Sequence, residues 1–433
     1  MWNWVLLLLF ASLVISKPEL ISVAIITNTG SRNIMYPEFY FIDKDEKARG
    51  NYSELTKMGK RQHYLLGHEI ANRYKDLITD PYPPSKVFVS CSGANATYES
   101  AQAFLLGLFP PGTGSLLINN RRDEIKPPIS VKDLKKIQDE LGYVALPHIQ
   151  RIIPIHSTNT TDDTYYSPHL ACKGFENEEE SLKDELDDLN IKYKDFLKKF
   201  ADDDPRMQEF DLTTEHCYKI QDTLQALKWN GFNATTFRSV KPETLEECAL
   251  ADVFKRFLGG SIRIKLMTYY LLSTMRHQFE QVMNNTKDAK NMSLFFLTDL
   301  HILAVFKLFD WHTNKVVPFA GQLIFELYRD EDEKEEEMFI MKAKYNETEL
   351  KFTRTSEYAS EIFTFIERNT FISRTEFEQA CRQPIHKDYD EEFYVSISIL
   401  LWLFLIGLWG VSWFIVLSED KPIIEPEEAI INY

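Results

Sequence analysis

Cysteine and acidic side chains are the first candidates for chemistry in this sequence. The five cysteines are Cys91, Cys172, Cys217, Cys248 and Cys381, and no two have the C-x-x-C spacing of a structural zinc site. A cysteine phosphatase loop needs an arginine six residues after its cysteine, but Thr97 occupies that place after Cys91. The acidic run 329–337 lacks the glycine and the alternating spacing of a calcium loop, which indicates a solvated hairpin tip. The sequence therefore predicts no metal and no cofactor.

Strands and helices alternate in the first 110 residues or so, which would position any site in that region. Residues 20–28 and 87–90 are short apolar runs, typical of buried strands. In 55–75 and 98–109 the apolar side chains recur at intervals close to three and four, which indicates helices. Strand, helix, strand, helix is the order of an α/β core with a parallel sheet.

The middle of the chain differs from the first part in its charge and in the spacing of its apolar residues. Residues 174–290 are rich in charge and in helical spacing, and they predict a helical cap insertion. A further strand is expected at 293–297, and the runs 322–328 and 338–345 predict a hairpin. The core is thus expected to consist of 17–173 and 291–385.

Both ends of the chain are strongly apolar. Residues 1–16 predict a signal peptide, with an uncleaved anchor as the alternative. Residues 394–417 carry no charge, and as a helix they would extend about 36 Å, enough to cross a hydrocarbon core of ~30 Å. A single C-terminal transmembrane helix behind a cleaved signal predicts a single-pass type I membrane protein with a cytoplasmic tail at 418–433.

Composition excludes two classes and supports a luminal ectodomain. A net charge of −16 argues against nucleic-acid binding, and 30 Phe among 433 residues argue against disorder. All seven Asn-X-Ser/Thr sequons fall between the two apolar ends, as expected for a glycoprotein of the secretory pathway. They begin at Asn51, Asn95, Asn159, Asn233, Asn284, Asn291 and Asn346.

Four segments resemble the histidine acid phosphatase family. The family's LT-x-x-G-x-x-Q-x-x-x-LG helix is similar to residues 55–74, LTKMGKRQHYLLGHEIANRY. Its SA-x-x-x-x-x-GL-PP segment is similar to residues 100–111, SAQAFLLGLFPP. PIH (154–156) and PFAGQLIFELY (318–328) are similar to two of its strands. The resemblance implies a phosphoglycerate-mutase-like three-layer core with a helical cap. It also implies phosphatase chemistry, with a nucleophilic His, phosphate-binding arginines and an Asp that protonates the leaving alcohol.

The residues at the family's reactive positions differ from that pattern. Where the family has Arg-His-Gly-x-Arg, this chain has Asn28-Thr29-Gly30-Ser31-Arg32, so the nucleophile has become Thr29. A phosphate-binding arginine after the second strand has become Ala96, and the late His-Asp pair reads Thr298-Asp299. Asp299 and Arg32 thus remain as a vestigial proton donor and a vestigial phosphate ligand. By the same pattern His301 occupies a helix position after the acid and is expected to be packed or solvent-facing.

These differences predict a pseudoenzyme that serves as a binding or scaffolding ectodomain. The alternative is an active acid phosphatase for phosphate monoesters, with Asp299 as proton donor and Arg32 as phosphate ligand. The expected partners are the membrane, an unknown protein or small-molecule ligand, and a second copy of the chain. The expected location is the cell surface or an endosomal or lysosomal membrane.

The resemblance also bears on cysteines and glycans. Cys172 and Cys381 match the position of a family disulfide. The family partner of Cys217 in the late strand is replaced by Gln322, so Cys217 is expected to pair with Cys248, leaving Cys91 as a free or partly buried thiol. A glycan at Asn95 would lie at the mouth of the family's pocket.

Overall fold

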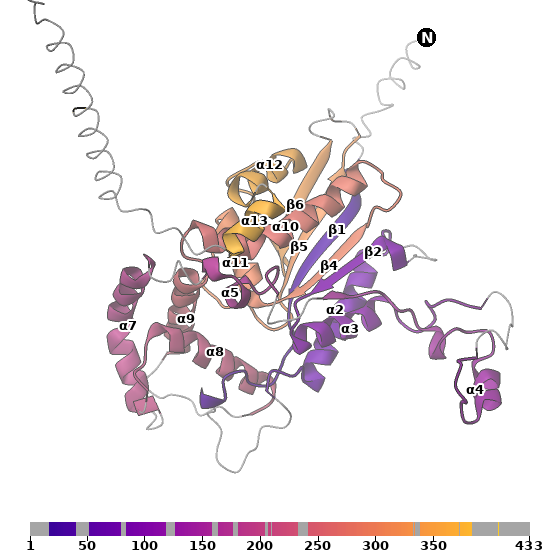
Figure 1. Cartoon of the computed structure of the whole chain (residues 1–433), viewed down its shortest axis with the longest axis horizontal. Coiled ribbons are helices and arrows are strands. Elements are labelled where there is room, and N and C mark those ends of the chain that lie inside the picture. Colours follow the sequence, from indigo (N-terminus) through magenta and orange to yellow (C-terminus); the bar gives the residue numbers. More distant parts are fainter. Residues whose placement is uncertain are drawn as a thin grey trace, which may run out of the picture. The chain divides into compact units, whose positions relative to one another are not determined.

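The structure is a computed structural model, and it describes most of the chain between residues 17 and 382. The described residues are 17–39, 52–78, 84–117, 126–157, 163–175, 181–203, 207–208, 210–232, 241–331, 333, 338–371, 373–382 and 406. The chain divides into two compact units, 1–382 and 383–433, and every helix and strand named below belongs to the first (Figure 1).

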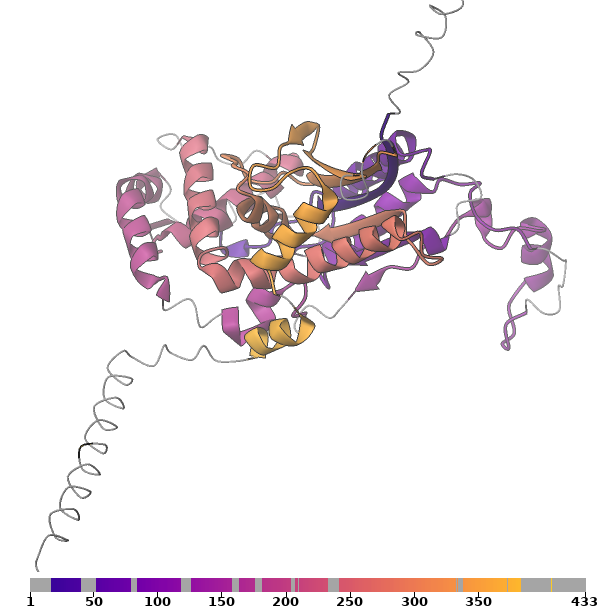
Figure 2. The same cartoon turned by 90° about the horizontal axis from the view of Figure 1, so that it is seen from above.

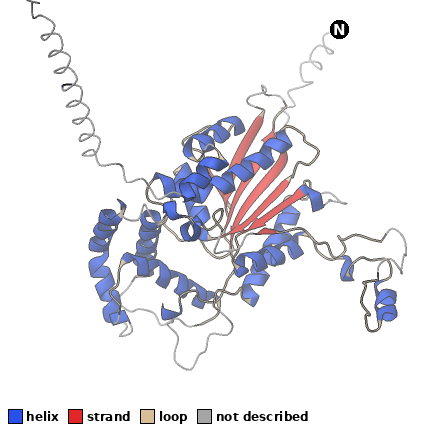
Figure 3. Ribbon diagram, viewed as in Figure 1, coloured by secondary structure: helices blue, strands red, loops and turns tan. Residues whose placement is uncertain are grey.

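Seven strands form one mixed sheet in the order β3-β2-β4-β1-β5-β6-β7. Figure 3 shows the sheet in red and the helices in blue. The strands are β1 (Glu19–Asn28), β2 (Val87–Cys91), β3 (His156–Ser157), β4 (Met292–Leu297), β5 (Gln322–Arg329), β6 (Phe339–Tyr345) and β7 (Thr348–Leu350). β3, β2, β4 and β1 are parallel to one another. β5 pairs antiparallel with β1, β6 with β5, and β7 with β6. The expectation of a parallel sheet is therefore right for four strands and wrong for the other three. The cause is the predicted β5–β6 hairpin, whose first strand pairs antiparallel with β1.

Helices cover both faces of the sheet (Figures 1 and 2). They are α2 (Lys57–Arg73), α3 (Asn95–Leu108), α4 (Leu134–Leu141), α5 (Pro168–Ala171), α7 (Lys183–Asp203), α8 (Thr214–Trp229), α9 (Pro242–Arg256), α10 (Ser261–Met283), α11 (Asp299–Phe309), α12 (Ala359–Asn369) and α13 (Arg374–Arg382). Short 3₁₀ turns lie at Pro37–Phe39, Pro84–Lys86 and Pro147–Ile149.

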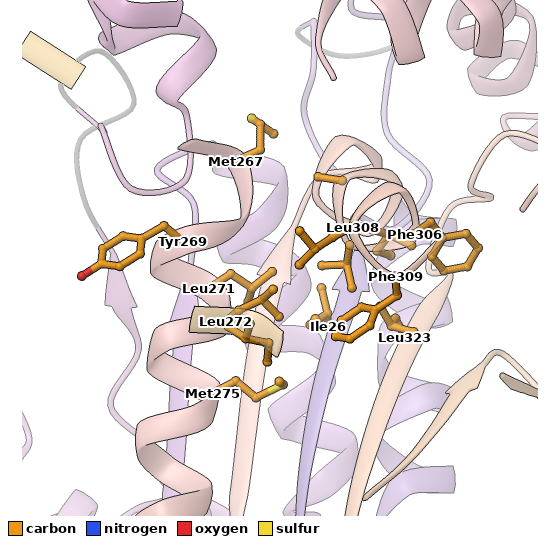
Figure 4. Close-up of a cluster of buried hydrophobic side chains, with 14 of the residues drawn as sticks. Ile26, Met267, Tyr269, Leu271, Leu272, Met275, Phe306, Leu308, Phe309 and Leu323 are labelled. Atoms are coloured by element: carbon orange, nitrogen blue, oxygen red, sulfur yellow. The ribbon is translucent and has the colours of Figure 1, made fainter. Parts of the chain in front are cut away.

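The central strand β1 shows why the core has three layers. Successive side chains of a strand point to opposite faces of the sheet, and all of Val23 to Ile26 are fully buried. Val23 and Ile25 pack in one hydrophobic cluster with α2 and α3, whereas Ala24 and Ile26 pack in another with α10, α11 and α12. Figure 4 shows this second cluster, where α10 contributes residues such as Leu271. Each fully buried side chain of this size contributes about 1.5–3 kcal/mol of transfer free energy.

Two glycines allow α2 and α3 to lie unusually close together. A Cβ on Gly67 would be 2.0 Å from the carbonyl oxygen of Phe104, and a Cβ on Gly107 would be 2.0 Å from that of Tyr64. Any larger residue would push the helices apart. This close contact holds α2 and α3 together as a pair on the face of the sheet that carries Val23 and Ile25.

The described parts of the predicted insertion, 174–290, contain helices joined by loops and turns and no strand, and these helices pack in two places. α7, α8 and α9 share their own hydrophobic cluster, which includes Cys217 and Cys248. α10 instead packs on the sheet. Both expected disulfides are confirmed: Cys172 bonds to Cys381 and Cys217 bonds to Cys248.

The predicted signal peptide, transmembrane segment and tail lie outside the described residues, apart from Ile406. In the part of the chain that is described, no helix combines the length and the apolar character needed to cross a membrane.

Candidate functional site

The loop after β1 is held by the residue that ends the strand. The Asn28 amide Nδ2 donates a hydrogen bond to the carbonyl oxygen of Pro318 at 3.0 Å, and its Oδ1 accepts one from the backbone N–H of Thr29 at 2.8 Å. Asn28 and Thr29 are both buried. The Asn28 side chain therefore holds the backbone of this loop, and both of its polar ends are used within the protein.

The helices α2 and α3 hold the same loop from below. Gln62 accepts a hydrogen bond from the Ser31 N–H at 2.8 Å, and Ser100 of α3 accepts one from the Gly30 N–H at 3.1 Å. His63 is fully buried, and burial lowers its pKa to about 4, so its ring is neutral at physiological pH. Its Nε2 lies 3.1 Å from the Asn28 carbonyl oxygen, which can only accept, so Nε2 carries the proton.

The guanidinium of Arg32 is bound by Asp222, a residue of the cap helix α8. Nη2 donates to Oδ1 at 2.5 Å and Nη1 to Oδ2 at 3.2 Å. The two side chains are 9% and 10% exposed, and the guanidinium also lies over the ring of Phe319. Burial alone would lower the pKa of Arg32, but the attraction of Asp222 outweighs it and the pKa is raised. Arg32 is thus a charged group whose partner is already in place.

Asp299 begins α11, directly after β4, and lies in the same cluster. The Tyr218 hydroxyl donates to its carboxylate, at 3.1 Å from Oδ2 and 3.3 Å from Oδ1. Burial raises the pKa of Asp299 to about 6, and repulsion by Asp222 adds to the rise, while Arg32 opposes it. At neutral pH the cluster therefore holds two carboxylates and one guanidinium.

Tyrosines supply the remaining polar groups of this cluster. Tyr218 and Asp222 are four residues apart on α8, so they share a helix face, and their hydrogen bonds show that this face meets Asp299 and Arg32. Burial raises the pKa of Tyr36 and of Tyr218, and repulsion by the two carboxylates adds to this, so both phenols stay protonated.

The other positions singled out in the sequence carry no charge. Ala96 is buried in the first turn of α3 and offers only a methyl group, while the sequon residue Asn95 beside it is exposed. The Thr298 hydroxyl lies 3.1 Å from His301 Nδ1. His301 is packed rather than solvent-facing, and burial lowers its pKa to about 3, which keeps the ring neutral. Cys91 is free and fully buried, and burial raises its pKa.

The structure brings Arg32 and Asp299 into one electrostatic cluster, and it adds residues that the sequence did not single out. Asp222 and Tyr218 are the most important of them. Their spacing in the sequence indicates a shared helix face, but nothing in the sequence shows that this face meets Arg32. In the described ranges no group of three or more His, Cys, Asp or Glu side chains could hold a metal ion.

Solved structures with a similar arrangement of sheet and helices include phytases. Hafnia alvei phytase in complex with myo-inositol hexakis sulphate has a TM-score of 0.56 and 14% identity, with 85% of this chain and 100% of that chain covered. The phytase from Citrobacter braakii has a TM-score of 0.56 and 12% identity, covering 84% and 99%. At these identities the likeness defines the fold class alone.

Sequence comparison defines the family. The sequence model of the histidine phosphatase superfamily (branch 2) matches residues 31–256, more than half of the chain. The lysosomal acid phosphatase of Xenopus laevis is 24% identical over 336 residues, covering 75% of this chain and 70% of that protein. The human lysosomal enzyme is 25% identical over 339 residues, covering 75% and 72%, and the rat prostatic acid phosphatase 23% over 325, covering 70% and 74%. The chain belongs to this superfamily, and its resemblance to the histidine acid phosphatases is confirmed.

Proposed function

We propose that this protein is a single-pass type I membrane glycoprotein whose histidine-phosphatase ectodomain does not hydrolyse phosphate monoesters. In this proposal the ectodomain binds a protein or small-molecule partner and acts as a scaffold. Thr29 takes the position of the nucleophilic His, and Asn28, Ala96 and Thr298 take positions where the family has charged or catalytic groups.

The observation that carries the proposal is the pairing of Arg32 with Asp222. A phosphate monoester is a dianion, and binding it requires cationic donors that are free to turn toward it. Arg32 donates from both terminal nitrogens to Asp222, so a phosphate would have to displace a carboxylate. Each lost charge-assisted hydrogen bond costs about 1.5–3 kcal/mol of binding free energy. The carboxylate of Asp299 would repel the same dianion at neutral pH.

The nucleophile is also missing. A threonine hydroxyl attacks phosphorus only when a base removes its proton. The two buried histidines of this region each bond elsewhere through one ring nitrogen, since His63 donates to the Asn28 carbonyl and His301 pairs with Thr298. Burial lowers the pKa of both rings, to about 4 and about 3, so neither is an effective general base for a phosphoenzyme at Thr29.

One observation favours the alternative of an active acid phosphatase. With a pKa of about 6, Asp299 is protonated in mild acid and could donate a proton to a leaving alcohol. A proton donor without a nucleophile and without a free phosphate ligand leaves the first step of the reaction unsupported. We therefore retain inactivity as the proposal.

Membrane anchoring rests on the uncharged segment 394–417, and luminal placement rests on the signal peptide and the sequons. The likeness to lysosomal acid phosphatases supports an endosomal or lysosomal membrane, and the cell surface is the other location that this topology permits.

The test is a phosphatase assay of the full chain purified from glycosylating eukaryotic cells. A generic phosphomonoester is offered from about pH 4 to 7 alongside human lysosomal acid phosphatase as the positive control. We expect no turnover above that of the Asp299→Asn variant prepared in parallel. Turnover comparable with the positive control that is lost in Asp299→Asn would refute inactivity and establish the alternative.

A further inference from the structure

The sequons lie in different surroundings. Asn95 and Asn284 are exposed, whereas Asn291 and Asn346 are half-buried; Asn51, Asn159 and Asn233 lie outside the described residues. Asn346 accepts a hydrogen bond from the N–H of Gln322 at 2.9 Å, so its side chain has a structural role. Asn291 is different because its side chain lines a cavity.

This cavity lies at the end of the sheet where β1 begins, at the opposite end of that strand from Asn28 and the cluster around Arg32. Its volume is about 640 Å³, within the range of small-molecule sites, which is about 300–1,000 Å³. The residues that line it include the aromatic residues Phe339 and Tyr74, the latter 2% exposed, and the charged residues Arg73 and Arg329, which also form ion pairs with Glu347 and Glu19. Apolar rings beside charged hydrogen-bonding groups suit a sugar, which has apolar C–H faces and a rim of hydroxyls.

The third residue of the same sequon, Ser293, gives an independent reason to consider a glycan here. Ser293 lies in β4 and is 1% exposed, and within the described structure its hydroxyl has no hydrogen-bond partner. A buried hydroxyl without a partner costs about 1–3 kcal/mol of folding free energy. The fold gains nothing from this hydroxyl, but the glycosylation sequon requires it.

The Asn291 amide is placed to carry a sugar into the cavity. Its backbone carbonyl accepts hydrogen bonds from the Val23 N–H at 3.0 Å and from the Ser22 hydroxyl at 3.1 Å, which fixes the residue beside β1. Nδ2 donates one of its two protons to the Ile21 carbonyl at 3.4 Å. Glycosylation replaces only one amide proton, so this hydrogen bond can persist.

We propose that Asn291 carries an N-linked glycan whose first sugars occupy this cavity and become part of the folded ectodomain. The inference rests on the luminal placement proposed above. In the transfer, Nδ2 loses a proton and bonds to the anomeric carbon of an N-acetylhexosamine. The bond from that carbon to the pyrophosphate of a lipid-linked donor breaks, and the pyrophosphate leaves with the electron pair. Transfer precedes folding, so the half-buried position of Asn291 does not prevent it.

Asn284 provides a matched control, because it is a sequon residue seven positions earlier that ends α10 in an exposed position. The full chain is produced in glycosylating cells, and site occupancy is measured by glycopeptide mass spectrometry. The folded protein is then treated with a peptide-N-glycosidase. We expect both sites to be occupied. The Asn291 glycan should be released at about one tenth of the rate of the Asn284 glycan or still more slowly, because local opening must come first. After denaturation both glycans should be released equally fast.

Substitutions at Ser293 test the contribution to stability without altering Asn291. Ser293→Ala removes the sequon together with the unpartnered hydroxyl, whereas Ser293→Thr preserves the sequon. We expect Ser293→Ala to lower the melting temperature relative to wild type and to Ser293→Thr, although it removes an unfavourable group. Asn284→Gln should leave the melting temperature unchanged.

Release of the two glycans from the folded protein at equal rates would overturn the proposal that the Asn291 glycan occupies the cavity. Occupancy of Asn284 without Asn291 would overturn the inference but leave luminal placement intact, and lack of glycan at both would overturn the two together.

Discussion

The pairing of Arg32 with Asp222 can be measured as a coupling free energy. Asp222→Leu would leave the buried guanidinium without the carboxylate that binds it, and Arg32→Met would leave the buried Asp222 carboxylate without its guanidinium. For a pair exposed by only 9% and 10%, breaking one side costs about 3–5 kcal/mol of unfolding free energy. Replacing both partners by apolar residues of similar size is often nearly neutral. The double variant Arg32→Met/Asp222→Leu should therefore be more stable than either single variant.

The assay is urea unfolding at pH 7.5 of residues 17–382, from the compact unit of the chain, for wild type and the three variants. The expected coupling is about 3 kcal/mol or more. Lys60 and Glu99 form a control pair at 2.8 Å whose side chains are 53% and 33% exposed, and the same cycle there should give less than about 1 kcal/mol.

Additive effects at Arg32 and Asp222, within about 0.5 kcal/mol, would refute the reasoning. Arg32 would then be free to bind an anion, and the main argument against phosphate binding would fail. A second measurement applies to the milder Asp222→Asn variant, which leaves Arg32 without its charged partner. Orthophosphate should raise the melting temperature of that variant but not of wild type, and sodium chloride should weaken the effect.

Three further predictions concern other buried groups. Asp299→Asn should stabilise the protein at pH 7.5 by about 1–3 kcal/mol in denaturant unfolding, because the folded state holds this proton up to about pH 6 whereas the unfolded state releases it near 4. The gain should shrink toward pH 4, and a gain independent of pH would contradict the assigned cause. Replacing Cys172 and Cys381 by Ser should lower the unfolding free energy by about 2–5 kcal/mol, because their disulfide closes a loop of 209 residues; unchanged thermal unfolding would contradict this. Cys91 should react with a thiol reagent only after denaturation, and a stoichiometric reaction of the folded protein would show that the thiol is accessible.

The sequence predicts the elements of the core well because their patterns are local. The strand expected at 20–28 is Glu19–Asn28 in the structure, and the helix expected at 55–75 is Lys57–Arg73. The antiparallel edge is harder to predict, because a hairpin pattern does not say which strand the hairpin will join or in which direction. Pairing of β5 with β1 is a property of the assembled sheet.

The residues of the candidate site likewise fall into those that the sequence predicts and those that only the structure shows. Arg32 and Asp299 follow predicted strands, so the sequence places them at one edge of the sheet. Asp222 lies in a region with many acidic residues, and no local pattern distinguishes it from carboxylates that face solvent. The role of Asn28 is likewise visible only once Pro318 lies within hydrogen-bonding distance, 290 positions along the chain.

Under the proposed function, the contact between Arg32 and Asp222 also restricts how the sequence could evolve. A reversion of Thr29 to His alone would place a nucleophile beside an arginine that is still neutralised, with no gain in turnover for selection to act on. A change of Asp222 alone would remove the carboxylate that binds a buried guanidinium and would be selected against for its effect on folding. Return to catalysis would need at least these two changes in one lineage before either is useful, so this contact adds to the difficulty of reversing the loss of activity by stepwise mutation.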